Sequence, residues 1–186
     1  MNTPSVDISF PHTWEAQILS ARPLILPPRH FVYPAQVEEV ERGALEVMVR
    51  PRNAAEFLAT CAVGFRDPAV PSGLWSAPNP EDLCAVSGGY AYILHTSAPE
   101  RFHMIPYRPV LQVLAAVEAG LLLFVGHRGI LAWGADGHAW ESDKLSDEGV
   151  MITGIECKEL RGAGWNMFTD KETPWVLDLT SGRIRA

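Results

Sequence analysis

The pattern of apolar and polar positions is clearest in the second half of the chain. Short apolar runs from Leu83 onward are separated by Gly, Asp-Gly or Pro, which is typical of antiparallel β-sheet proteins. Four successive runs, at 110–117, 121–125, 130–133 and 139–142, are joined by the turns Glu-Ala-Gly, Gly-His-Arg-Gly and Asp-Gly. These runs predict an up-and-down meander of strands.

The N-terminal part of the chain shows a different pattern. Residues 1–36 hold a dense set of prolines, and each proline fixes φ and removes a backbone donor, which excludes a regular helix. Large apolar side chains in the same segment favour an extended arm packed on the body of the protein over a free tail. These side chains are Leu24, Ile25, Leu26, Phe31 and Val32.

Three segments connect this arm to the meander. Residues 43–49 alternate between apolar and polar positions and predict a strand, whereas residues 54–65 fit either a short helix or a strand. Residues 66–82 are rich in Pro and Gly and predict a long loop. The segments 85–94 and 116–125 share the order strand, glycine turn, strand, which either marks a structural repeat or follows from β-propensity alone.

Together these patterns predict an all-β fold, with one or two short helices at most. We expect antiparallel meanders packed as a sandwich or an open barrel, with an arm over residues 1–36 and a single β-rich domain over residues 37–186. The hairpins at 133–140 and 177–183 resemble those of β-propeller blades, over about thirty residues in all. A complete propeller needs at least four blades of about forty residues, which this chain of 186 residues with its Pro-rich front does not supply.

Asp136-Gly137 is the strongest turn signal in the chain. This dipeptide favours a two-residue type I′ turn, because both central residues of that turn need positive φ. The turn predicts that Trp133 faces Trp140 across the hairpin, with both indoles and Leu131 on one face. We expect the two rings to be core anchors and not a ligand platform. The opposite, solvated face is expected to carry Ala132, Glu141 and Asp143.

Charge and hydropathy limit the kinds of partner. The chain has 15 Lys and Arg against 22 Asp and Glu, a formal net charge of -7, and such a surface repels nucleic-acid phosphates. The longest apolar run, at 113–126, is interrupted by Glu118 and Gly120 and is shorter than the roughly 20 residues that span a bilayer. The N-terminus lacks the features of a signal peptide. We therefore expect no nucleic-acid partner, no membrane span and a cytoplasmic location.

Residues that could carry chemistry form no recognisable motif. Cys61, Cys84 and Cys157 have no C-x-x-C spacing and are expected to be reduced, buried thiols. The histidines show no metal-ligand spacing, and the acidic segment 141–149 lacks the ligand spacing of a calcium loop. Ser87, before two glycines, lacks the strand-and-helix context of a nucleophile elbow. We therefore expect no metal, nucleotide or other cofactor.

These observations favour a non-enzymatic binding module that recognises another protein or associates with itself through loops or a sheet face. The alternatives are a small-molecule sensor or enzyme with a pocket between sheets, and a subunit of a β-rich homo-oligomer. No catalytic residue is assigned. The candidate binding residues are Tyr90, Tyr92, His95, His103, His127 and His138.

Overall fold

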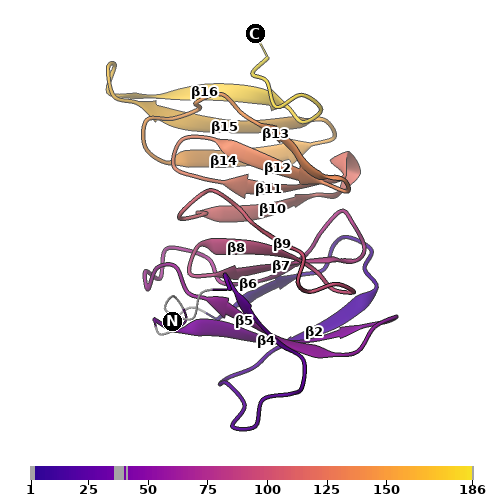
Figure 1. Cartoon of the computed structure of the whole chain (residues 1–186). Helices are drawn as coiled ribbons and strands as arrows, with labels where there is room; N and C mark the ends of the chain where they lie inside the picture. Colours follow the sequence, from indigo (N-terminus) through magenta and orange to yellow (C-terminus); the bar gives the residue numbers. More distant parts are fainter. Residues whose placement is uncertain (1–2, 36–39, 41, 186) are drawn as a thin grey trace. The chain divides into compact units, whose positions relative to one another are not determined.

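The fold consists almost entirely of β-strands. A computed structural model describes residues 3–35, 40 and 42–185, and the chain divides into two compact units, Met1–Pro109 and Val110–Ala186 (Figure 1). Each unit contains two β-sheets, so the all-β prediction is confirmed. The division after Pro109 differs from the expected arm over residues 1–36 and single domain over residues 37–186.

Two sheets make up unit 1. Its described strands are β1 (Ser5–Asp7), β2 (Trp14–Ile18), β3 (His30–Tyr33), β4 (Ala44–Pro51), β5 (Phe57–Ala62), β6 (Gly73–Ser76), β7 (Asp82–Ser87), β8 (Tyr90–His95) and β9 (Phe102–Met104). Sheet 1 has the order β1-β6-β7-β8-β9, and sheet 2 has the order β2-β4-β5-β3. The pairs β1–β6 and β3–β5 are parallel and the other pairs are antiparallel.

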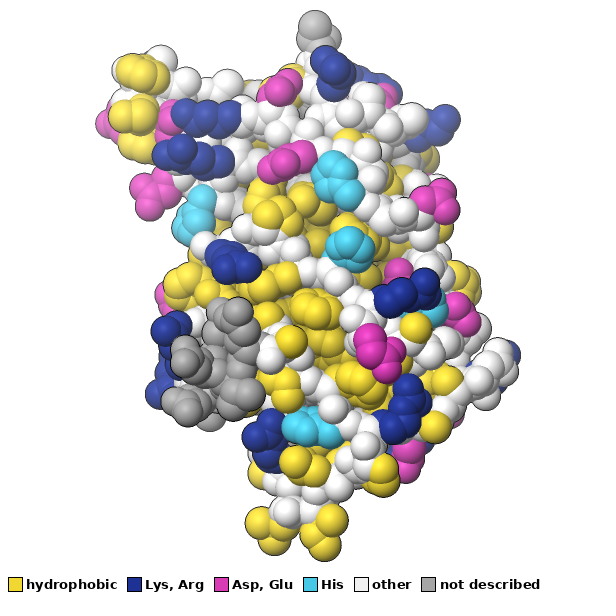
Figure 2. All heavy atoms as spheres, viewed as in Figure 1, with side chains coloured by type: hydrophobic (Ala, Val, Ile, Leu, Met, Phe, Trp, Pro, Cys, Tyr) yellow, Lys and Arg dark blue, Asp and Glu magenta, His cyan; other side chains and the backbone are white. Residues whose placement is uncertain are grey.

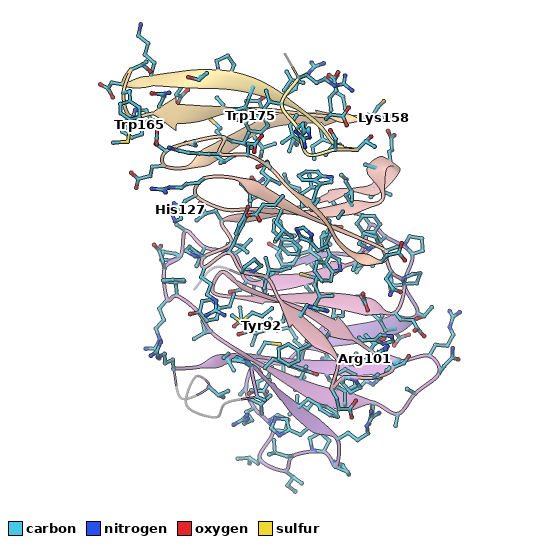
Figure 3. The ribbon with its side chains drawn as sticks, turned by 45° about the horizontal axis from the view of Figure 1, so that its top comes forward. Tyr92, Arg101, His127, Lys158, Trp165 and Trp175 are labelled. Carbon is cyan, nitrogen blue, oxygen red and sulfur yellow. The ribbon has the colours of Figure 1, made fainter. Side chains whose placement is uncertain are left out.

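The core of unit 1 lies between these two sheets. Alternate side chains along each strand point to the same face, and the inward-facing set is apolar. It comprises Trp14, Tyr33, Leu45, Val47, Val49, Phe57, Ala59, Cys61, Leu74, Leu83, Ala85, Tyr92 and Leu94. Tyr92 is fully buried there (Figure 3), and its hydroxyl donates a hydrogen bond to the carbonyl oxygen of Ala62 at 3.0 Å.

The N-terminal segment contributes strands to both sheets, because β1 pairs with β6 while β2 and β3 form the edges of sheet 2. The apolar tip of the loop between β2 and β3 is exposed, with Leu24 at 104%, Ile25 at 88% and Leu26 at 44% (Figure 2). This corrects the expectation that these three side chains pack on the body. The flanking prolines restrict the backbone of the loop, and the tip stands away from the sheet.

The structure decides one open alternative in unit 1 and corrects one predicted loop. The ambiguous segment 54–65 contains the fully buried strand β5. The predicted loop at 66–82 contains β6, whose Leu74 and Trp75 are buried. The parallel partner of β6 is β1, which lies far away in the sequence, and a local pattern carries no signal for such a pairing.

Unit 2 follows the predicted meander closely. Its elements are β10 (Gln112–Ala116), the 3-10 turn η1 (Val117–Ala119), β11 (Leu121–Val125), β12 (Ile130–Gly134), β13 (Gly137–Glu141), β14 (Val150–Glu156), β15 (Glu159–Asn166) and β16 (Lys171–Asp178). Sheet 3 has the order β10-β11-β12-β13, and sheet 4 has the order β14-β15-β16. An antiparallel meander of four strands, as in sheet 3, is also the topology of one propeller blade.

The register of the β12–β13 hairpin differs from the prediction. The two turn residues are Ala135 and Asp136, and Gly137 pairs with Gly134 at a φ of +112°. A further register shift then places Trp140 opposite Ala132 instead of opposite Trp133. The extra residue of β13 at this shift is Ala139, because His138 pairs with Trp133 and Trp140 pairs with Ala132. Gly137 follows the turn and is not one of its two central residues.

This register puts the two indoles on opposite faces of sheet 3, because a slip of one residue turns a side chain to the other face. Both rings are buried, as predicted. Trp140 lies in the core between sheets 3 and 4, and its Nε1 donates to the carbonyl oxygen of Leu179 at 2.8 Å. Ala132, expected to be solvated, is fully buried in the same core.

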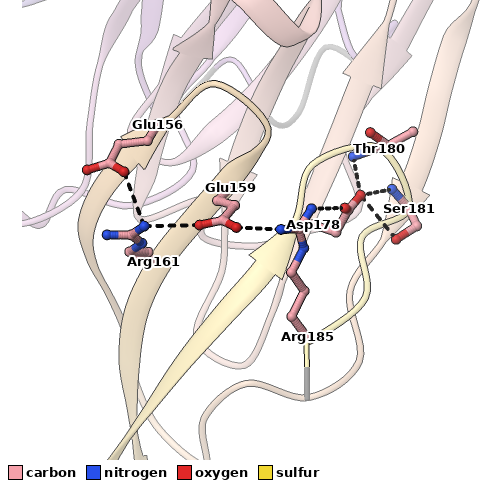
Figure 4. Close-up of polar contacts among 7 residues, drawn as sticks. All are labelled: Glu156, Glu159, Arg161, Asp178, Thr180, Ser181 and Arg185. Carbon is pink, nitrogen blue, oxygen red and sulfur yellow. Dashed lines mark hydrogen bonds and ion pairs between the residues drawn. The ribbon is translucent and has the colours of Figure 1, made fainter.

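A network of ion pairs ties the C-terminal residues to sheet 4 (Figure 4). Arg185 pairs with Glu159 and with Asp178, and Glu159 also accepts from Arg161 at 3.1 Å. The Asp178 carboxylate also accepts from the backbone amides of Thr180 and Ser181. The bond from Arg185 and these amide bonds lower the pKa of Asp178 to about 2.

We predict that Trp140→Ala lowers the free energy of unfolding by about 3–5 kcal/mol, because it leaves a cavity in the core and an unpaired carbonyl. Gly137→Val should cost about 1–2 kcal/mol, because a β-branched residue is strained at positive φ. His138→Ala, an exposed neighbour, is the control and should change little. Denaturant titration measures all three. A Trp140→Ala variant as stable as the control would contradict the core assignment.

We predict that acid weakens the C-terminal network. The folded pKa of Asp178 is depressed to about 2, below the ordinary value of about 3.9. Its contribution to stability is therefore complete above the ordinary value and is lost as the pH falls towards about 2. Asp178→Asn should be less stable than wild type at neutral pH, and the difference should shrink in acid. Asp136→Asn, at an exposed turn, is the control, and a difference independent of pH would contradict the prediction.

Candidate functional site

The six residues proposed from the sequence do not come together in one site. Tyr92 lies inside the core of unit 1. Tyr90 begins strand β8, where its ring lies against Phe65, and His95 ends the same strand. His127 precedes strand β12 and His138 pairs with Trp133 near its far end, so the two turns that hold them lie at opposite ends of that strand.

His95 and His103 belong to a charged cluster at one end of sheet 1. Asp82 is the register partner of His95, and Glu81 lies 3.5 Å from its Nε2. Burial raises the pKa of the Asp82 carboxyl, while His95, Arg101 and His103 oppose that rise. Within the described part of the chain, no three His, Cys, Asp or Glu side chains are placed to hold a metal ion.

The cysteines do not form a reactive site either. All three are free, with Cys61 and Cys84 buried and Cys157 exposed in the β14–β15 turn. The expectation that every thiol is buried is therefore wrong for Cys157. Burial raises the pKa of Cys61 and of Cys84, so both are protonated at neutral pH and are not nucleophilic thiolates.

An open groove in unit 2 is a stronger candidate for a functional site. Its volume is about 360 Å³, near the lower end of the range for small-molecule pockets. The groove is bounded by the loop after β13, by the β15–β16 hairpin and by the C-terminal residues. Its lining residues are Lys144, Leu145, Ser146, Asp147, Gly164, Trp165, Asn166, Phe168, Thr173, Pro174, Trp175 and Ile184.

One wall of the groove is the segment 144–147, which crosses closely over β15. A Cβ atom on Gly164 would lie 2.0 Å from the carbonyl oxygen of Leu145, so only glycine permits this approach. The Ser146 hydroxyl accepts from the backbone N–H of Trp165 at 3.0 Å. Leu145 and Ser146 are buried, which corrects the interpretation of the segment as a wholly solvated loop.

Asp147 connects this wall to the β15–β16 turn. Its carboxylate forms an ion pair with Lys144 and accepts from the backbone N–H of Met167 at 2.9 Å. The hydrogen bond from Lys144, followed by that from Met167, lowers the pKa of Asp147. The carboxylate is therefore charged at neutral pH, and it holds the tip of the hairpin in place.

Three aromatic residues, Trp165, Phe168 and Trp175, also line the groove. Trp165 and Trp175 come from the neighbouring strands β15 and β16 (Figure 3). Trp165 is 36% exposed and Phe168 is 87% exposed, and Figure 2 shows hydrophobic side chains at the outer end of this hairpin. Trp175 is 6% exposed, and its Nε1–H is buried without a hydrogen-bond partner among the described residues. Two exposed aromatic residues and one buried tryptophan thus line the groove.

The sequence analysis did not identify this groove. Its lining comes mainly from segments that begin at residues 144, 164 and 173. The pattern of each segment by itself predicts a loop or an ordinary strand. One signal was present, because Trp165, Met167 and Phe168 cluster at a turn, where a folded chain has no need of large apolar side chains. A contiguous exposed apolar patch of this kind marks an interaction site.

Two further findings bear on function. In the described part of the chain, no helix has the length and apolar character to cross a bilayer. A scan against protein-family models finds no match, and no curated protein is significantly similar in sequence.

Proposed function

We propose that this protein is a non-enzymatic interaction module and that the groove of unit 2 binds an apolar, proline-containing segment of a polypeptide. The observation that carries the proposal is the exposure of Trp165, Met167 and Phe168 at the β15–β16 turn, where Trp165 and Phe168 line the groove. Aromatic-lined grooves are a recurring means of recognising proline-rich segments.

The chemistry of the groove favours binding over catalysis. The Ser146 hydroxyl is used by the backbone of Trp165, and Lys144 is paired with Asp147. These polar groups are therefore occupied in maintaining the groove, and none is a nucleophile next to a free base, as covalent catalysis requires.

The shape of the groove also favours a chain segment. An enclosed pocket covers most of the surface of a small ligand, whereas this groove is open to solvent. An extended peptide can lie across such an opening and place one or two side chains against the rings. Restriction of its backbone by proline lowers the entropy lost on binding.

We predict that a random peptide library selected on the intact protein yields proline-containing, apolar sequences. Phe168→Ala and Trp165→Ala should each weaken the binding of a selected peptide at least tenfold, as expected for aromatic residues that carry much of the binding energy. Phe65→Ala, which removes an exposed ring from unit 1, is the matched control. Titration followed by tryptophan fluorescence gives the affinities, and thermal melts confirm that each variant is folded.

Two outcomes would contradict the proposal. Equal binding of a selected peptide to the Phe168→Ala, Trp165→Ala and Phe65→Ala variants would exclude the groove as the site. The proposed function would be overturned if selection on wild type enriched no proline-containing peptide relative to selection on the Trp165→Ala variant.

A further inference from the structure

We infer that the segment bound by the groove comes from a second copy of this chain, and that it is the loop at residues 19–29 between β2 and β3. This inference rests on the proposed function. It assigns one occupant to the groove and one role to the exposed loop, and it makes the protein a self-associating module.

The loop has the chemistry that the groove is built to bind. Leu24 and Ile25 are almost fully exposed and Leu26 is 44% exposed, and these three residues lie between Pro23 and Pro27. Three consecutive exposed aliphatic residues form an apolar knob whose burial is strongly favoured. The flanking prolines match the class of segment that aromatic grooves recognise.

The base of the loop is firmly anchored, so the knob is presented in a restricted conformation. Arg22 pairs with the buried Glu46 at 3.1 Å, and the Thr60 hydroxyl donates to Glu46 at 2.5 Å. Thr60 also contacts His30 Nε2 at 2.9 Å. On the other side of the tip, Arg29 donates to a backbone carbonyl oxygen at 2.6 Å. A segment held in this way loses less conformational entropy when it binds.

The charges of the two surfaces are complementary. The loop at 19–29 contains two arginines and no carboxylate, and Arg22 is paired with Glu46 of β4. The segments 144–148 and 165–172 beside the groove carry more acidic than basic residues. The acidic residues are Asp147, Glu148, Asp170 and Glu172, and the basic residues are Lys144 and Lys171. Opposite charge favours encounter between a loop and a groove and disfavours contact between two grooves.

Each molecule has one loop and one groove, so the contact joins two different surfaces. Such a contact gives a closed dimer when two copies exchange their loops, and a ring or an open chain when it repeats in one direction. In each case association should increase as concentration rises. This arrangement permits an experiment that separates the two surfaces.

The test uses two variants of the full chain in sedimentation velocity. The loop variant, Leu24→Asp with Ile25→Asp, removes the knob and leaves the groove intact, whereas Phe168→Asp damages the groove and leaves the loop intact. Wild type should associate with concentration, and each variant alone should associate at least tenfold more weakly. An equimolar mixture should form a heterodimer that grows no further. Val117→Asp, at an exposed position of η1, is the control and should behave as wild type.

A synthetic peptide with the sequence of residues 22–29 provides an independent measurement. It should bind the loop variant, whose groove is free, and should not bind the Phe168→Asp variant. Wild type that remains monomeric at high concentration, or a loop variant that associates as wild type does, would overturn the inference. The proposed function would stand in either case if library-selected peptides still bind through Trp165 and Phe168, and it would fail separately if they do not.

Discussion

Burial of apolar sheet faces against one another is the constraint on which each unit depends. In unit 1 the alternate side chains of β4 and β5 meet those of β7 and β8, and in unit 2 sheets 3 and 4 enclose Trp140, Trp175 and Leu177. A sheet that is apolar on one face must bury that face against another layer. Each sheet therefore packs against a second one. The loop at 19–29 and the groove of unit 2 are formed by residues outside these two cores.

The loop and the groove are both shaped by polar contacts at the margins of these cores. Thr60 is fully buried on the outer face of sheet 2, and its hydroxyl satisfies Glu46 while it also contacts the loop through Arg22. In unit 2, the Ser146 hydroxyl and the absence of a side chain at Gly164 bring the segment 144–147 onto β15. A buried polar group that lost its partner would destabilise the fold. The same contacts thus stabilise each unit and position its exposed apolar residues.

The sequence predicts those parts of the fold that local patterns determine. Apolar alternation and turn residues predict the meander of sheet 3 and the strand β4, and both are confirmed. Pairings distant in sequence, such as β1 with β6, leave no local signal. The register of the Trp133–Trp140 hairpin depended on whether Gly137 sits within or after the turn, a difference that one dipeptide cannot settle. The groove is formed by three segments that are separate in the sequence, and no local pattern places them together. The sequence therefore indicated only its exposed aromatic residues.

The β16 edge of sheet 4 is covered at Val176 and Asp178, which favours association there through side chains over β-strand addition. An exposed strand edge is a ready template for pairing with another chain. The backbone groups of Val176 and Asp178 that point away from β15 are bound by Arg185 and Arg183. Alternate residues point the same way, so Pro174 lies on this edge, where it has no N–H to donate. With the edge closed in this manner, the surface that unit 2 offers beside Pro174 is the aromatic groove, whose specificity depends on the shape and charge of the segment it receives.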